Sequence, residues 1–531
     1  MTMCVARRVR AWSLCDSAPR CGIFLACGLG IAMTSVASAD DVDPFANVPV
    51  CVVGHGAEEG GGVGPLPIAN MFLESEPNDA IGTPQVVAAN LDERTTVEGG
   101  IGASGDVDFY SIALSQGDVV QFYVESLTAD HSVQLELFDA MDALTVTTRT
   151  DVLSAPIFVA PTAPFITSPG NDFADWSASL IWVVQADRDV VIAVSSDDEF
   201  GSLDTGDYTL HITRVRAPIE TAPPGTTLRV FLDFDGAMIT QGDIYNPAPG
   251  PDPLSPLADF LPDWGLDATD EDAVIDAILA GVQLRIDDLE RLNPLFQYEL
   301  LNSRDHADPF GEPFVTRVII GGTIDELGVA TIGIAESLDV GDFAPNQTAF
   351  LLLDILSSET NSVSLNNIPR DPGFSMIDAI GQAVSILTSH ELGHNIGGVH
   401  TENGNGTRSV MDAGGSNIPR NLYGVGADGI FGTEDDEVVL FAVDEYIGSG
   451  PNSSLEGFEP TNFVAAIAFG GPTGCAADLT GDETVNGADL AFLLANWDAP
   501  GISDFNGDGV TNGADLAALL SVWGPCDVLK K

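Results

Sequence analysis

Short stretches of alternating apolar and polar residues dominate the chain between Glu74 and Val215. Clusters of Gly, Asp, Ser and Pro separate these stretches, a pattern typical of strands joined by turns. Strands are expected at 110–114, 119–124, 134–138, 181–184, 190–194 and 208–212. Because no helical periodicity separates them, the segment is predicted to form an all-β sandwich.

The pattern changes after a Pro-rich stretch at 214–226. Apolar residues recur every three or four positions across 270–292, which predicts an amphipathic helix. Ser375 and Asp378 form a start signal for a second helix with an apolar stripe. Strands are expected at 228–234, 315–320 and 349–355. Strands with intervening helices predict a mixed α/β domain.

The length and the net charge of the chain exclude several classes of protein. A chain of 531 residues predicts several domains rather than one small module. Asp and Glu number 79 against 19 Lys and Arg, so the net charge is -60. Phosphate binding needs a basic surface, so no nucleic acid partner is expected. The 45% hydrophobic content excludes a disordered acidic tail.

The N-terminus has the features of an export signal. Three arginines at 7–10 precede an apolar run at 22–36, and Ala37-Ser38-Ala39 is typical of a cleavage site. Residues 1–39 are therefore predicted to be a signal peptide, and the mature protein is expected to be secreted or docked at the cell surface. No later run of about 20 uncharged apolar residues occurs, so no transmembrane segment is expected in the mature chain.

Three of the seven histidines lie close together, at His390, His394 and His400. Histidines four apart on a helix share one face and can bind one metal ion. Glu391 lies on the same turn, where it can hold a metal-bound water and transfer its proton, so it is the candidate general base. The glycine pair at 397–398 can adopt positive φ and turn the chain, which would bring His400 to the metal. Three histidines and an open position predict a catalytic Zn²⁺ site.

The segment from His390 to His400 resembles the metzincin signature HExxHxxGxxH, matched without a gap. The resemblance covers roughly 226–460 and implies a zinc peptidase that hydrolyses peptide bonds without a covalent intermediate. It also implies a methionine turn beneath the histidines, for which Met411 is suitably placed. Thr401 and Ala413 depart from the residues of several subfamilies, so no subfamily follows.

Four short motifs mark the all-β segment, at 76–79, 105–110, 116–118 and 206–210. They resemble the bacterial pre-peptidase C-terminal (PPC) domain family over about 140 residues. In that family the module accompanies secreted peptidases, commonly after the catalytic domain, whereas here it would precede it. A spacer sandwich without a ligand is the favoured interpretation.

A twelve-residue pattern occurs twice near the C-terminus, at 478–489 and 504–515. Oxygen-bearing side chains recur at positions one, three, five, nine and twelve, which is the spacing that surrounds one Ca²⁺, with position seven completing the ligand set. The candidate ligands are Asp478, Thr480, Asp482, Thr484, Asn486 and Asp489, and then Asp504, Asn506, Asp508, Val510, Asn512 and Asp515. Short helices are expected at 488–497 and 514–523. The doublet resembles type I dockerin modules, which implies docking to a cohesin-type partner; a solvated acidic turn is the alternative.

The mature chain would keep three cysteines. Cys475 and Cys526 bracket the dockerin-like module and could form a disulfide between its ends. Cys51 would remain as a single thiol near the new N-terminus. Metzincin precursors often place a pro-segment cysteine on the zinc, so the resemblance implies a latency role for Cys51, with an idle or intermolecular thiol as the alternative.

The predicted order of domains is a signal peptide at 1–39, a flexible lead-in or pro-segment at 40–72, a PPC-like sandwich at 73–216, a linker at 217–226, a metzincin-like domain at 227–460, a linker at 461–474 and a dockerin-like module at 475–527. We expect a secreted zinc metalloendopeptidase with protein or peptide substrates that uses Zn²⁺ and Ca²⁺. The alternatives are a catalytically idle calcium-dependent binding or scaffold protein, or a cellulosome-like component in polysaccharide catabolism. No pair of carboxylates with a glycosidase context supports the last.

Overall fold

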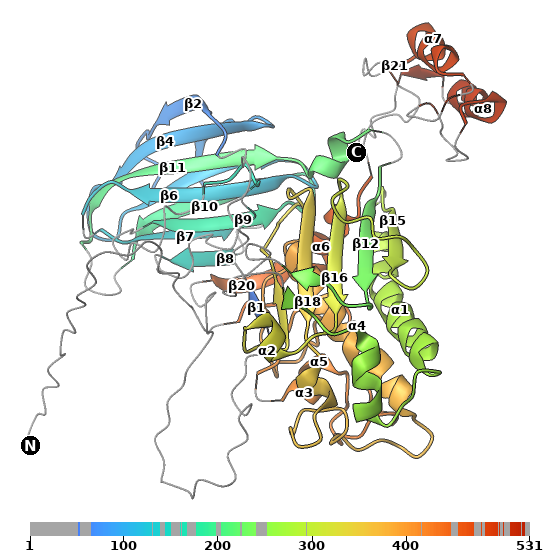
Figure 1. Ribbon diagram of the computed structural model, residues 1–531. Helices are drawn as coiled ribbons and strands as arrows, with labels where there is room; N and C mark the ends of the chain where they lie inside the picture. The colour runs from blue at the N-terminus through green and yellow to red at the C-terminus, as the bar shows by residue number, and fades with distance from the viewer. Residues whose placement is uncertain are drawn as a thin grey trace, which may run out of the picture.

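The computed structural model describes most of the chain from Cys51 onward (Figure 1). The described ranges are 51–53, 65–129, 131–138, 144–149, 160, 162–166, 177–197, 203–223, 226–239, 252–293, 295–415, 417–447, 455–471, 479, 484–497, 499, 503, 510–521 and 523–525. The predicted signal peptide, both cysteines of the predicted disulfide and six candidate calcium ligands (Asp478, Thr480, Asp482, Asp504, Asn506 and Asp508) lie outside them.

Two sheets pack face to face, and most of their strands come from the first half of the chain. One has the order β19-β20-β8-β7-β10-β5-β3, and the other β2-β4-β11-β6-β9. Buried residues from both sheets, among them Val97, Tyr110, Leu135 and Trp182, form one core. The strands are β2 (Ile68–Leu73), β3 (Gln85–Val86), β4 (Glu93–Ile101), β5 (Val107–Leu114), β6 (Val119–Ser126), β7 (Val133–Phe138), β8 (Leu144–Arg149), β9 (Ala178–Val183), β10 (Arg188–Ser196) and β11 (Gly206–Val215). The predicted all-β character is confirmed.

The seven-stranded sheet crosses the predicted domain boundary at 216. Strands β19 (Val443–Glu445) and β20 (Leu455–Pro460) come from the segment assigned to the peptidase domain, and β20 pairs with β8. Tyr446, next to β19, packs into the sandwich core. Alternating polarity predicts a strand but not its partner, so this long-range pairing was not foreseen.

A six-stranded sheet forms the centre of the second unit, in the order β1-β17-β18-β16-β12-β15. All neighbouring pairs are parallel except β17 with β18. The strands are β1 (Cys51–Val53), β12 (Leu228–Asp233), β15 (Tyr298–Asn302), β16 (Val315–Ile320), β17 (Gly333–Ala335) and β18 (Asn346–Leu351). The strand expected at 349–355 ends at Leu351, because a short helix begins at Asp354.

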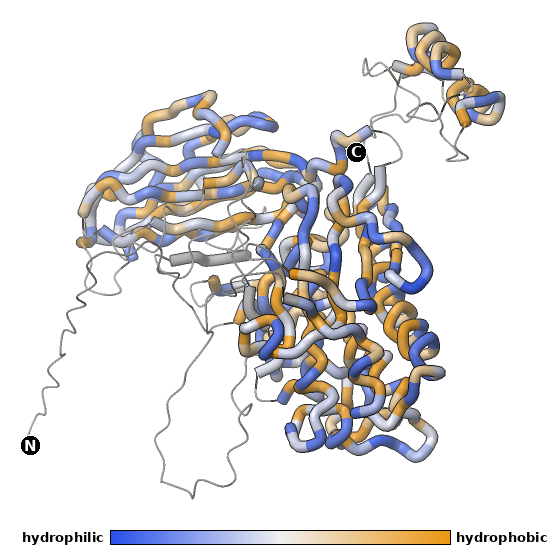
Figure 2. Tube along the Cα trace, in the orientation of Figure 1, coloured by the Kyte–Doolittle hydropathy of each residue, from blue (hydrophilic) through white to orange (hydrophobic). Residues whose placement is uncertain are grey.

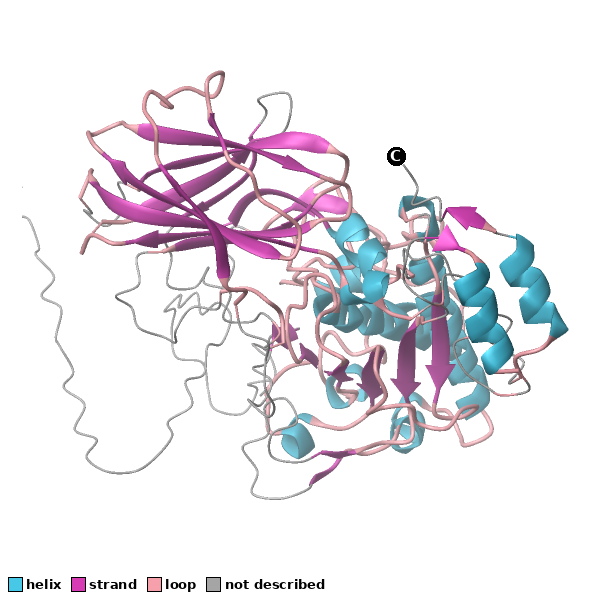
Figure 3. Cartoon of the chain, turned by 90° about the horizontal axis from the view of Figure 1, so that it is seen from above, coloured by secondary structure: helices cyan, strands magenta, loops and turns pink. Residues whose placement is uncertain are grey.

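Two long helices, α1 (Glu271–Asp287) and α4 (Met376–Asn395), pack against each other, and α4 lies on the sheet over β16, β17 and β18. Figure 3 shows this helical region beside the strands of the sandwich. Ser375 and Asp378 form the predicted capping box of α4. Shorter elements are η2 (Pro218–Thr221), β13 (Met238–Ile239), β14 (Asp252–Pro253), η3 (Leu257–Trp264), η4 (Glu290–Leu292), α2 (Ile324–Leu327), α3 (Asp354–Ser357), α5 (Ile418–Leu422) and α6 (Thr461–Ala468).

The C-terminal segment contains two short helices, α7 (Gly487–Ala495) and α8 (Gly513–Ser521). Strand β21 (Thr484–Val485) pairs with β22 (Gly524–Pro525), so the two ends of the segment lie side by side. A small core contains Val485, Leu493 and Leu519. Figure 2 shows the apolar residues of both helices. Among the described residues no helix is both long and apolar enough to cross a bilayer.

Candidate metal centre and active site

The last turns of α4 bring the predicted zinc ligands together. His390, His394 and His400 are all buried, at 0%, 1% and 8% exposure. Their ring centroids lie 4.8 to 5.2 Å apart, and Nε2 of His394 is 3.2 Å from Nε2 of His400. Three imidazoles from one helix and the loop after it therefore converge on one point.

Backbone carbonyls hold two of these rings by their Nδ1 atoms. His390 Nδ1 donates to the carbonyl of Val410 at 2.6 Å, and His394 Nδ1 donates to that of Gly398 at 2.7 Å. A proton on Nδ1 leaves the Nε2 lone pair available as a ligand. His390 Nε2 is buried and has no hydrogen-bond partner among the described residues, as expected of an atom that binds a metal.

Burial also keeps the rings neutral. It lowers the pKa of His390 to about 4 and that of His400 to about 3, with the neighbouring histidine adding to the effect at His400. The pKa of His394 falls well below its usual value, chiefly through burial and then through both neighbouring rings. Neutral imidazole is the form that binds metal, so the three residues fit a Zn²⁺ site with three nitrogen ligands.

The turn after α4 needs its glycines for two different reasons. Gly397 has φ +103°, and a side chain there would strike Val340. Gly398 was also expected to adopt positive φ, but it does not. The space beside it is tight instead, because a Cβ would lie 3.1 Å from the carbonyl oxygen of Gly393 and 3.2 Å from Met411. Met411 is fully buried and also fills the space beside Gly393, so it packs against the histidine-bearing helix. Its role as a methionine turn stays a prediction.

Two strand-like contacts hold the segment that carries His400. The amide of Thr401 donates to the carbonyl of Met411 at 2.8 Å, and Thr401 also bridges Tyr446. The amide of Val399 donates to both carboxylate oxygens of buried Glu459, at 3.1 and 3.2 Å. Glu459 was not among the predicted site residues, because it lies 59 positions beyond His400 on β20 and no local motif links the two.

Glu391 lies fully buried between the histidine turn and strand β17. A side chain on Gly333 would overlap Glu391 Oε1, so β17, which lies next to the edge strand β1, approaches the carboxylate closely only because residue 333 is glycine. Gly333 was another residue that the sequence did not single out. Strand β1 runs along the same edge and pairs Cys51 with Gly333 through the backbone.

A second group of metal-ligand side chains lies in the sandwich, formed by Glu76, Asp79, Asp106 and Asp108. Their oxygens lie within 4.8 Å of one another. Asp108 is fully buried, and its Oδ1 has no hydrogen-bond partner among the described residues. In the sequence these residues stand out only as part of the segments 76–79 and 105–110 that resemble the PPC family. Four carboxylates this close together could hold a cation.

The described part of the C-terminal loops has a local role at each helix start. Asp489 Oδ2 accepts from the amide of Asn486 at 2.8 Å, and Asp515 Oδ2 accepts from the amide of Asn512 at 2.7 Å. The ninth and twelfth residues of each loop therefore cap α7 and α8. Calcium binding by these loops stays a prediction.

No family model matches the chain, and no curated protein does. Among solved structures, the pre-peptidase C-terminal domain of a Bacillus anthracis collagenase is 12% identical, with 25% of this chain and 95% of that domain covered at a TM-score of 0.16. PliG of Aeromonas hydrophila, a periplasmic inhibitor of g-type lysozyme, is 10% identical, with coverages of 27% and 98% and a TM-score of 0.15. A surface-associated copper-binding protein of Methylomicrobium album is 5% identical, with coverages of 28% and 98% and a TM-score of 0.16. TM-scores of this size do not establish a shared fold.

Proposed function

We propose that this protein is a zinc-dependent metalloendopeptidase of the metzincin type. The observation that carries the proposal is the convergence of three buried, neutral imidazoles beside the carboxylate of Glu391. Zinc, when bound there, would polarise the scissile carbonyl and lower the pKa of water to near 7. His390, His394 and His400 would hold the ion.

The chain's own groups would then carry the proton transfers. Glu391 would accept a proton from the attacking water and donate it to the leaving nitrogen. The carbonyls of Val410 and Gly398 would keep the first two rings in one orientation. Gly333 would keep the carboxylate next to the sheet edge along which a peptide substrate can extend.

The flanking regions support a secreted enzyme with an attachment module. We propose a PPC-like identity for the sandwich and a dockerin-like identity for the C-terminal segment, which would bind Ca²⁺ and dock to a cohesin-type partner. The repeated capping pattern of α7 and α8 fits a duplicated module. The sequence features at 1–39 support export.

The proposal includes latency through Cys51. Its support is that β1 forms the edge of the sheet beside β17, which places the backbone of Cys51 opposite Gly333 and so close to Glu391. A peptide segment on this edge would compete with substrate for the same backbone groups.

The decisive experiment measures casein hydrolysis by the zinc-loaded protein, the Glu391→Gln variant and the exposed control Glu359→Gln. We expect Glu391→Gln to lose at least about 100-fold in rate while it retains one Zn²⁺ per chain by metal analysis. The control should be unaffected. A chelator should abolish hydrolysis, and added Zn²⁺ should restore it.

Zinc-loaded protein that hydrolyses no protein substrate, even after removal of the N-terminal segment, would favour the idle binding or scaffold protein. Failure to bind Zn²⁺ at all would refute the metal centre itself. The His394→Ala variant removes one of the three proposed ligands. It therefore shows how protein that has lost its zinc behaves in the same assays.

Latency is tested separately by alkylating the thiols of the full-length protein. We expect alkylation or Cys51→Ser to raise the initial rate, and zinc to protect Cys51 from labelling. Unchanged activity together with equal labelling with and without zinc would dismiss the latency role and leave the peptidase proposal intact.

A further inference from the structure

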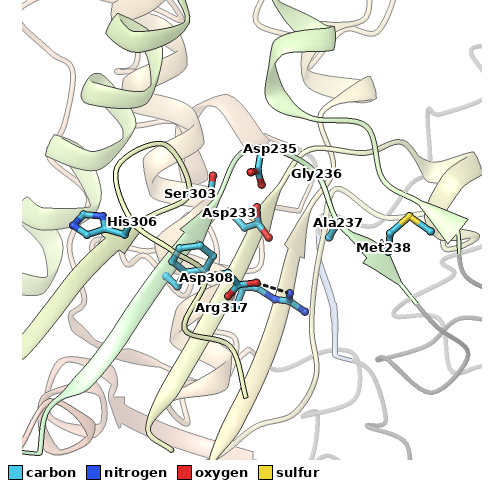
Figure 4. Close-up of a pocket in the computed structure, with 10 residues that line it drawn as sticks. Asp233, Asp235, Gly236, Ala237, Met238, Ser303, His306, Asp308 and Arg317 are labelled. Carbon is cyan, nitrogen blue, oxygen red and sulfur yellow. Dashed lines mark ion pairs between the residues drawn. The ribbon is translucent and has the colours of Figure 1, made fainter. Parts of the chain in front are cut away.

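A pocket of about 360 Å³ lies away from the zinc ligands, at the carboxyl ends of β12 and β15. The two strands are parallel neighbours, so the chain leaves both at the same edge of the sheet. Asp233 ends β12, Asp235 follows it, and Ser303 follows β15. Figure 4 shows these three side chains together, with Asp308 and Arg317 nearby.

Asp233 has an incomplete set of partners. Only 4% of the residue is exposed, and its buried Oδ1 has no hydrogen-bond partner among the described residues. A buried carboxylate oxygen without a partner destabilises the fold, so it indicates a missing ligand. Burial, and then the hydrogen bond and charge of Asp235, raise the pKa of Asp233 to about 8. Two carboxylates this close need a shared proton or a cation between them.

The charge balance of the pocket also favours a cation. Asp233, Asp235 and Asp308 contribute three carboxylates, and Arg317 contributes one guanidinium. Arg317 lies 3.9 Å from Asp308 and stacks over the ring of Phe310. The guanidinium charge also acts on Asp233. Ionisation of all four groups would leave two negative charges, which one divalent ion balances.

The donor atoms that line the pocket indicate which cation it would bind. Ser303 Oγ accepts from the amide of Phe234 at 2.8 Å, which fixes the hydroxyl beside the carboxylates and leaves a further lone pair. The other candidate, His306, has its Nδ1 near the backbone of Asn302 and is exposed. A set of carboxylate and hydroxyl oxygens suits calcium rather than zinc or copper. Calcium also accepts irregular sites completed by water, and this pocket has room for several water molecules.

We propose that Asp233, Asp235 and Ser303 bind one calcium ion that ties the end of β12 to the end of β15. The ion neutralises the charge of the two carboxylates. It fastens two loops of the zinc-bearing unit without taking part in hydrolysis, and the site is independent of the proposed peptidase activity.

The test counts and measures bound calcium in the full-length protein. All variants carry Glu391→Gln, so that self-cleavage cannot confuse the result. Native mass spectrometry and calorimetric titration with Ca²⁺ are compared for the parent, Asp235→Asn, Asp233→Asn and the exposed control Glu359→Gln. We expect both aspartate variants to bind one ion fewer than the parent, or to bind one site at least about tenfold more weakly. The control should match the parent.

Melting temperatures separate a metal ligand from a residue needed only for folding. In chelator, Asp233→Asn should melt no lower than the parent, because it removes the unpartnered carboxylate. When calcium is added, the melting temperature of this variant should rise by less than that of the parent. Equal calcium stoichiometry and affinity in parent and Asp235→Asn would overturn the proposal. Full displacement of this ion by an equal concentration of Mg²⁺ would overturn its identity as calcium.

Discussion

Gly333 and Glu391 illustrate how one missing side chain shapes the proposed active site. The carboxylate occupies the space that a Cβ on residue 333 would fill. Glycine costs some strand stability, but here it permits close approach of backbone to a buried carboxylate. The position of the base therefore depends on a residue 58 positions earlier in the chain.

We predict that Gly333→Ala lowers kcat/KM for a peptide substrate at least about tenfold while zinc content stays at one ion per chain. The new methyl group must push the Glu391 carboxylate aside, and displacements of about 1 Å are costly to catalysis. Gly373→Ala is the control, because its Cβ would make only an ordinary 3.4 Å contact with Asp371. Full activity in Gly333→Ala would show that Glu391 does not need its present position.

Asp108 is a buried carboxyl group whose protonation the fold controls. Burial is the main cause that raises its pKa to about 8, and Glu74 adds to it, although Tyr208 donates a hydrogen bond to Oδ2 at 2.7 Å. An unfolded aspartate titrates near 3.9. The folded state therefore binds this proton more tightly, and the resulting stability is complete below about pH 4 and is lost as the pH rises toward 8.

Asp108→Asn should accordingly raise the melting temperature at pH 8 by a few degrees, equivalent to at least about 1 kcal/mol, and have little effect near pH 4. The measurement is thermal unfolding in a calcium chelator, so that no cation neutralises the acidic group. Asp189→Asn, an exposed change on β10, serves as the reference. The same shift at both pH values would contradict the assigned protonation.

At the scale of elements, the contact between α1 and α4 depends on small residues. A Cβ on Gly381 would lie 2.6 Å from the Cβ of Ala277, and one on Gly281 would overlap Ser385. The helices can therefore approach closely where α4 begins its course toward the histidines. This close packing fixes the helix that carries two of the three proposed ligands.

Gly381→Ala should destabilise the protein by roughly 1–3 kcal/mol in urea unfolding, even though alanine is the better helix former by about 1 kcal/mol. The reason is overpacking against Ala277. Gly487→Ala in α7 is the comparison, because nothing lies within 4 Å of its Cβ position. Stabilisation by Gly381→Ala would mean that the two helices can separate at little cost.

In the whole molecule, the sandwich and the unit that carries the three histidines share a sheet. Tyr446 belongs to the segment that also bridges Thr401, yet it packs in the sandwich core at 8% exposure. Strand β20 pairs with β8 of the sandwich. The carboxylate of Glu459, also on β20, accepts a hydrogen bond from the amide of Val399. The sandwich is thus connected to the chain that carries His400.

We predict that Tyr446→Ala lowers stability by about 3 kcal/mol and weakens both units together. Hydrogen exchange mass spectrometry should show faster exchange in β7 and β10 as well as around 399–402. Phe458→Ala, which removes a side chain that is 51% exposed on β20, should leave both regions unchanged. Faster exchange confined to one unit would show that the shared sheet does not couple them.

Elements whose causes are local can be predicted from the amino-acid sequence. Helix α4, its Ser375–Asp378 capping box and the spacing of His390 and His394 all follow from residues three or four positions apart. The strands of the sandwich follow from period-two alternation. These features depend on neighbours within one or two turns, so inspection of the chain could find them.

Which distant residues meet depends on how the whole chain packs. The pairing of β20 with β8, the approach of Gly333 to Glu391, the support of Val399 by Glu459 and the joining of Asp233 with Ser303 all link positions at least 58 residues apart. Period-two or helical patterns record which face of an element is apolar, but not which element covers it. Close packing in the folded chain makes that choice, because only one arrangement fills the space without voids or overlaps.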